Sequence, residues 1–173
     1  MTSTLRLRFL GPFQVERAGE PLTAFKSNKV RALLAYLVAE RHTAHHREVL
    51  ADLLWPESDG ATALALLRDV LSNLRALLGD RDAATPYIQV AGDTLRFVPH
   101  ADTRLDVATF AELTGPDADP AALEAARLLY RGDFLEGFAL RDTPDFDAWL
   151  LLQREAYRRT AREALYRLTT HHL

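Results

Sequence analysis

Residues 29–78 carry three amphipathic helical patterns in quick succession, and this order constrains the fold more than any other feature of the chain. The first helix is expected over about residues 27–40, and the second over about residues 46–55, before a proline-containing loop. The third is the longest, and Gly79 after it suits a left-handed C-cap. Its apolar stripe consists of Leu64, Leu67, Leu71, Leu74 and Leu78.

A strand hairpin is predicted directly after the third helix. In YIQVAGDTLRFVP, Ile88 and Val90 match Leu95 and Phe97 in type, and Gly92 supplies the positive φ of a tight turn. Three helices followed by a hairpin is the order of a winged helix-turn-helix, whose third helix enters the DNA major groove. This order therefore predicts a DNA-binding fold.

The opening residues predict a small antiparallel sheet. LRLRFLG and FQVER each alternate apolar and polar residues, and a cluster of turn formers follows at residues 17–21. The fold class expected for residues 1–101 is therefore α+β, a winged helix-turn-helix with an N-terminal antiparallel sheet and a C-terminal hairpin as its wing.

The rest of the chain, residues 102–173, shows helical patterns and is expected to form a second, all-α domain. Leu165 and Leu168 still form an apolar stripe close to the last residue. We expect them to expose apolar surface because the helical domain continues beyond this sequence, and the chain should therefore self-associate through this helix or fray there. The helix starts are marked by Asp106, by Asp119 with Pro120, and by Thr143 with Pro144.

Charge gives only modest support for DNA binding. The net charge is −3, but residues 1–101 hold 12 Lys/Arg against 11 Asp/Glu, whereas residues 102–173 hold 9 against 13. The acidity thus lies outside the half predicted to bind DNA, although a nearly neutral half attracts phosphate weakly. The absence of cysteine excludes disulfides and thiolate metal sites. No apolar run resembles a signal peptide or a membrane span, so a cytoplasmic protein is expected.

Several segments resemble a known family in the right order. KVRALLAYL, HREVLADLLWPES and LRDVLSNLRALLG resemble the winged helix of the Streptomyces antibiotic regulatory proteins (SARP), related to the OmpR/PhoB type. LDVATFAEL and LYRGDFLEGFALRDTPDFDAWLLLQRE resemble the start of the bacterial transcriptional activator domain, with its tetratricopeptide-like helix pairs. The resemblance covers essentially the whole chain and implies a transcriptional regulator, usually an activator, that binds double-stranded DNA beside a promoter and acts on RNA polymerase.

The face of the third helix opposite its leucine stripe holds the candidates for reading bases. Arg68 suits guanine or phosphate, Asn73 suits adenine or phosphate, and Ser72 suits either, whereas Ala65 and Ala76 stand where the family often has polar residues. The alternative is an ordinary solvated helix face. The full set of predicted DNA contacts is Lys26, Lys29, Arg47, Thr62, Arg68, Ser72, Asn73, Arg75 and Arg96.

Phosphate contacts are expected at two helix starts. Arg47 begins the second helix, and Lys26 and Lys29 begin the first, where free N–H groups and the helix dipole favour anions. A solvated surface charge is an equally good reading of each of these residues.

Other chemistry has little support in the sequence. His42, His45 and His46 lie close together, but a zinc site needs three or four ligands in fixed geometry, so no metal and no cofactor is expected. Phosphate-binding loops and nucleophile motifs are absent, which argues against an enzyme. The sequence predicts a sequence-specific DNA-binding regulator. The alternative is a protein-interaction module whose winged helix has lost most of its DNA affinity.

Overall fold

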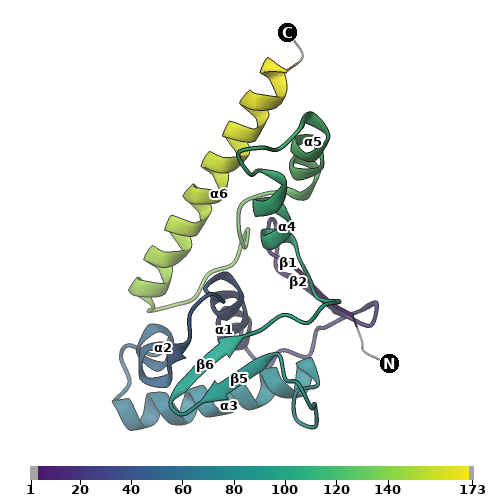
Figure 1. Ribbon diagram of the computed structural model, residues 1–173. Coiled ribbons are helices and arrows are strands. Elements are labelled where there is room, and N and C mark those ends of the chain that lie inside the picture. Colours follow the sequence, from purple (N-terminus) through teal and green to yellow (C-terminus); the bar gives the residue numbers. More distant parts are fainter. Residues whose placement is uncertain (1–3, 172–173) are drawn as a thin grey trace. The chain divides into compact units, whose positions relative to one another are not determined.

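The structure, a computed structural model that describes residues 4–171, is of the α+β class, with six helices and small sheets in that range (Figure 1). Its contacts divide the chain into two compact units. Unit 1 holds the residues up to 19, residues 104–139 and those from 148 on, and unit 2 holds residues 20–103 and 140–147. Among the described residues, no helix is both long enough and apolar enough to cross a membrane.

Unit 2 contains three helices and a three-stranded antiparallel sheet. The hairpin has the predicted register, with Ile88 opposite Phe97 and Val90 opposite Leu95, and Gly92 in its turn has φ 59°. A further strand, β4, lies between the first two helices in the sequence and pairs with β6 of the hairpin. The strand order of this sheet is β4-β6-β5. The elements are β3 (Glu20–Pro21), α1 (Asn28–Ala39), β4 (His45–His46), α2 (Arg47–Leu54), α3 (Gly60–Leu78), β5 (Ile88–Ala91) and β6 (Thr94–Phe97).

The core of unit 2 forms where the apolar faces of the three helices and of the hairpin meet. On α3, Leu67, Leu71, Leu74 and Leu78 are at most 4% exposed, which confirms the predicted stripe, whereas Leu64 is half-buried. Burial of such side chains is the main stabilising contribution, on the order of 1.5–3 kcal/mol for each leucine. The same stripe fixes which side of α3 is left for solvent.

Unit 1 combines a small sheet with three helices. Strand β1 pairs with β2 in antiparallel fashion, as predicted, and also with β7 in parallel fashion, which was not predicted. In Figure 1, β1 and β2 lie close to α4. The elements are β1 (Leu5–Arg8), β2 (Gln14–Arg17), β7 (Arg104–Leu105), α4 (Asp106–Leu113), α5 (Pro120–Leu129) and, from residue 148 on, α6 (Pro144–Thr170).

Asp106 ties the start of α4 to the end of β1. The N–H of Phe9 donates to both carboxylate oxygens at 2.9 Å, and the N–H of Leu10 donates to Oδ2 at 2.8 Å. Burial raises the pKa of Asp106, and the surrounding N–H groups and Arg131 act in the opposite direction. Asp106 was expected to cap the helix, but the N-cap residue is Leu105, because the carboxylate serves the strand instead.

These contacts divide the chain differently from the boundary predicted near residue 101. Residues 6 and 7 pair with β7, and Phe9 and Leu10 bond to Asp106, so this opening segment belongs to unit 1. Parallel pairing with a strand almost 100 residues away leaves no local pattern in the sequence, which is why the opening strands were assigned to the first domain.

Helix α6 is held by arginines and presents apolar side chains to solvent. Arg154 donates to the carbonyl oxygens of Phe134, Leu135 and Phe138 at 2.9, 2.8 and 3.0 Å. Near the end of the helix, Leu165 is 44% exposed, as expected, whereas Leu168 is half-buried. The other large apolar residues of α6 that are exposed are Leu151, Leu152 and Tyr166.

Candidate nucleic-acid interface

Helix α3 begins and ends at well-defined caps. At its start, Asp59 accepts a hydrogen bond from the N–H of Thr62 at 2.7 Å, and this bond lowers the pKa of Asp59. At its end, Gly79 adopts the left-handed conformation with φ 74°, as predicted. The caps fix a helix of 19 residues whose outer face is set by the buried stripe.

The outer face of α3 is mostly small and contains one central arginine. Arg68 is exposed, as expected, and Thr62 and Ser72 are exposed on either side of it. Between them, small side chains let another surface approach the helix closely. One acid, Asp69, also lies on this face. We call this surface the α3 face, and it consists of Ala61, Thr62, Ala65, Arg68, Asp69, Ser72 and Ala76.

Asn73 does not belong to the α3 face. It is only 9% exposed, and its Oδ1 accepts a hydrogen bond from the N–H of Lys26 at 3.0 Å. The expectation that Asn73 would be exposed is wrong, because position 73 lies one turn after buried Val70 and so faces the start of α1. Its amide serves a structural bond there.

The hairpin is fastened to the end of α3 by a buried carboxylate that the sequence reading missed. Asp80 is 5% exposed and accepts hydrogen bonds from the N–H groups of Tyr87 at 2.8 Å and Ile88 at 2.9 Å. The only signal in the sequence is an acid placed directly after the C-cap glycine. This fastening gives α3 and the hairpin a defined mutual geometry.

Two predicted contact residues, Arg75 and Ser72, also take part in this bracing. Arg75 is half-buried, and its Nη2 lies 3.4 Å from the carbonyl oxygen of Ile88 in β5. Ser72 accepts a hydrogen bond from Arg81 at 2.9 Å. Both residues therefore have protein partners, although Ser72 and Arg81 are exposed.

The hairpin tip lies beside the start of α2. The N–H of Arg47 donates to the carbonyl oxygen of Asp93 at 2.9 Å, and a cavity of about 200 Å³ is lined by His46, Arg47, Glu48, Leu64 and Asp93. Arg96 of β6 is exposed and donates from Nε to the carbonyl oxygen of Arg41 at 3.0 Å. The structure thus brings Arg47 close to the hairpin, as a joint phosphate contact requires.

The two lysines at the start of α1 differ. Lys26 is exposed, but Lys29 is half-buried, donates to the carbonyl oxygen of Leu54 and lies 5.4 Å from the ring centre of Trp55. Burial lowers the pKa of Lys29, and the charge of Asp142 acts against this. These partners make Lys26 the better placed of the two for a phosphate.

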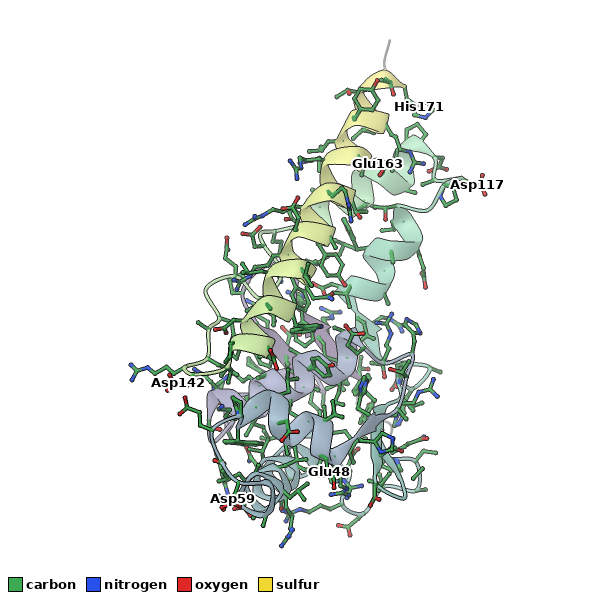
Figure 2. The ribbon with its side chains drawn as sticks, turned by 90° about the vertical axis from the view of Figure 1, so that its left-hand side faces the viewer. Glu48, Asp59, Asp117, Asp142, Glu163 and His171 are labelled. Atoms are coloured by element: carbon green, nitrogen blue, oxygen red, sulfur yellow. The ribbon has the colours of Figure 1, made fainter. Side chains whose placement is uncertain are left out.

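Carboxylates border the same surface. Glu48 and Asp59, labelled in Figure 2, are exposed at the starts of α2 and α3. Together with Asp69 on the α3 face they limit the positive potential that the arginines create.

His45, after the α1–α2 loop, has partners within unit 2. His45 is half-buried, contacts the carbonyl oxygen of Glu40 at 2.9 Å, and packs against Tyr36 with ring centres 5.3 Å apart. Between residues 4 and 171, no three histidine or acidic residues are grouped to hold an ion.

Comparisons with known proteins show a likeness to a solved structure. No protein-family model matches the chain, and a search of curated proteins finds no match. The solved structure of Mycobacterium tuberculosis EmbR in complex with a low affinity phosphopeptide is similar, with a TM-score of 0.67 and 27% sequence identity. The match covers 94% of this chain and 45% of the EmbR chain, so this chain spans less than half of that protein's length. The likeness supports the fold of a SARP-like transcriptional regulator.

Proposed function

We propose that this protein is a sequence-specific DNA-binding transcriptional regulator and that unit 2 is its winged helix. The observation that carries the proposal is the α3 face, where exposed Arg68 stands among alanines on a long helix. A helix enters the major groove only if its outer side chains are small or can bond to base edges. The α3 face has both kinds of residue.

Arg68 is proposed to read a base. Its guanidinium can donate two parallel hydrogen bonds to O6 and N7 of a guanine, which is the commonest specific contact in the major groove. Ala65 and Ala61, one and two turns earlier, leave room for the helix to sink into the groove. Thr62 and Ser72 are placed to donate to bases or phosphates on either side of Arg68.

The phosphate contacts are assigned to Arg47, Lys26 and Arg96. Arg47 lies at the start of α2, where the helix dipole adds to its charge, and its N–H bonds to the hairpin tip. Arg96 lies on the hairpin itself. Because Asp80 fastens the hairpin to α3, these groups and Arg68 would meet the duplex in a fixed register.

Unit 1 is proposed to be the opening part of a tetratricopeptide-like activator domain. The capped helix α5 and the long helix α6 are in keeping with such helix pairs, and the exposed leucines of α6 suit contact with a further helix or a second copy. In this proposal the protein is an activator that brings RNA polymerase to a promoter.

The test begins with duplexes enriched from a random pool on the purified chain. Fluorescence anisotropy then compares the enriched duplex with a scrambled one at two salt concentrations. Arg68→Ala should weaken binding to the enriched duplex by about 1–3 kcal/mol and leave the scrambled duplex unaffected. Arg47→Ala should weaken both equally and reduce the salt slope by about one contact.

The matched control is Arg162→Ala, which removes an exposed arginine from α6 that bonds to Glu155 at 3.0 Å. It should change neither affinity nor slope. If no duplex is enriched, or if all three variants bind like the parent, the α3 face does not read DNA.

The alternative is a protein-interaction module. The observation in its favour is the acidic charge of Asp69 on the α3 face and of Asp59 and Glu48 beside it, which opposes phosphate. A shallow dependence of affinity on salt, together with no preference for any duplex, would make this the better description.

A further inference from the structure

Three arginines project from one face of the sheet in unit 1. In β1, Leu5 and Leu7 are at most 1% exposed, so Arg6 and Arg8 point to the opposite face, because successive side chains alternate. Arg104 of β7 is paired with Arg6 in the parallel register and therefore shares its face. Neighbouring strands lie about 4.8 Å apart, and alternate residues on a strand are about 6.6 Å apart, so the three side chains start close together.

These arginines line a cavity that is partly open to solvent. Its volume is about 240 Å³, and α4 and α5 contribute walls through Thr109 and Leu129. Ligand sites for drug-sized molecules measure about 300–1,000 Å³, so this cavity suits a smaller group.

The charged residues that line the cavity are three arginines and one carboxylate, Asp106. Glu16 lies 4.0 Å from Arg6, but both side chains are solvent-accessible, so this pair is weak. The carboxylate of Asp106 also lines the cavity, yet its oxygens already accept hydrogen bonds from the end of β1. Arg131 is not part of the lining and donates to Gln14, the residue paired with Arg8, at 3.0 Å.

We propose that this cavity binds the phosphate or diphosphate group of a small molecule through Arg6, Arg8 and Arg104. Guanidinium groups bind phosphate oxygens in pairs of parallel hydrogen bonds, which is why arginines cluster at such sites. A small ligand is favoured over a duplex because the arginines surround a hollow, whereas a DNA backbone needs an extended ridge or groove. The site lies in unit 1, so the proposal does not depend on DNA binding by the α3 face.

The test is isothermal titration of the purified chain with sodium pyrophosphate at low ionic strength. We expect saturable binding that Arg8→Gln and Arg104→Gln each weaken about tenfold or more, because hydrogen bonds to charged groups are the strong ones. Arg104→Lys keeps the charge but not the paired bonds and should fall in between. Arg159→Gln, an exposed arginine of α6, is the control and should bind like the parent. Urea unfolding of each variant shows that it is folded before its affinity for pyrophosphate is compared with that of the parent.

Two further arms identify the source of the phosphate. A nucleoside diphosphate should compete with pyrophosphate, and a 20-base-pair duplex of random sequence should bind the parent and Arg8→Gln equally. The proposal is overturned if pyrophosphate does not bind the parent, or if the glutamine variants bind it as well as the control does. It is also overturned if Arg8→Gln weakens duplex binding and leaves pyrophosphate binding unchanged, since the arginines would then be a DNA contact.

Discussion

Replacing Asp80 tests how the hairpin is held against α3. Asp80→Ala removes the acceptor of two buried N–H groups, those of Tyr87 and Ile88, at 2.8 and 2.9 Å. Each buried N–H group left without an acceptor costs roughly 1–3 kcal/mol, and the variant no longer has to bury a carboxylate, which offsets part of the cost of the two groups. We therefore expect the free energy of unfolding to fall by about 2–4 kcal/mol. This is a large fraction of the roughly 5–15 kcal/mol by which a typical domain is stable.

The assay is urea unfolding followed by the fluorescence of Trp55, which lies in unit 2. A Trp149→Phe background removes the second tryptophan, which lies in unit 1, so the signal reports on unit 2. Asp82→Ala, at an exposed position two residues away, is the control and should stay within about 0.5 kcal/mol of the background. If Asp80→Ala costs no more than Asp82→Ala, the carboxylate does not hold the hairpin. Asp80→Asn, with one acceptor oxygen left, should be intermediate.

The remaining predictions concern stability and pH. Arg154→Ala should destabilise unit 1 by about 2–4 kcal/mol in urea unfolding followed by the fluorescence of Trp149, because three carbonyl oxygens lose a charged donor. If the variant has the same free energy of unfolding as the parent, Arg154 does not hold α6 in this way. Gly79→Ala should cost about 1–2 kcal/mol at φ 74°, whereas Gly60→Ala, whose added Cβ meets open space, should not destabilise. Burial raises the pKa of Asp106, so the folded chain holds this proton more tightly than the unfolded chain does. Relative to Asp106→Asn, the unfolding free energy of the parent should therefore fall as pH rises from about 4 to 7, and a rise over that range would contradict the assignment.

The sequence predicted correctly those elements, α3 and the hairpin, whose formation depends on interactions between residues close together in the chain. Leucines at helical spacing located α3, and Gly79 ended it, because a stripe and a positive φ are properties of neighbouring residues. Gly92 with matched apolar pairs predicted the hairpin and its register for the same reason. The exposure of Arg68 followed from the stripe, since a helix with one buried side has a defined opposite side.

Long-range pairings could not be predicted from the same patterns. Asn73 looks like a contact residue in the sequence, but its partner is a backbone N–H 47 positions away. Asp106 looks like a helix cap, yet it bonds to residues 96 and 97 positions earlier. In both cases a polar residue at a helix position could serve solvent, a ligand or a distant backbone group, and its sequence neighbours do not distinguish these uses.

The parallel pairing of β1 with β7 has a consequence for synthesis on the ribosome. Residues 20–103 must be made before β7 exists, so until then β1 can pair with β2 but not with its parallel partner. During that interval Phe9 and Leu10, both 0% exposed in the finished fold, lack the segment around Asp106 and Phe134 that covers them. The nascent chain therefore carries an apolar strand that is open to premature association until more than half of the protein has been translated. A fragment that ends at residue 101 would carry the same open strand permanently, and excision of the three-helix unit is better begun at residue 20 than at the first residue.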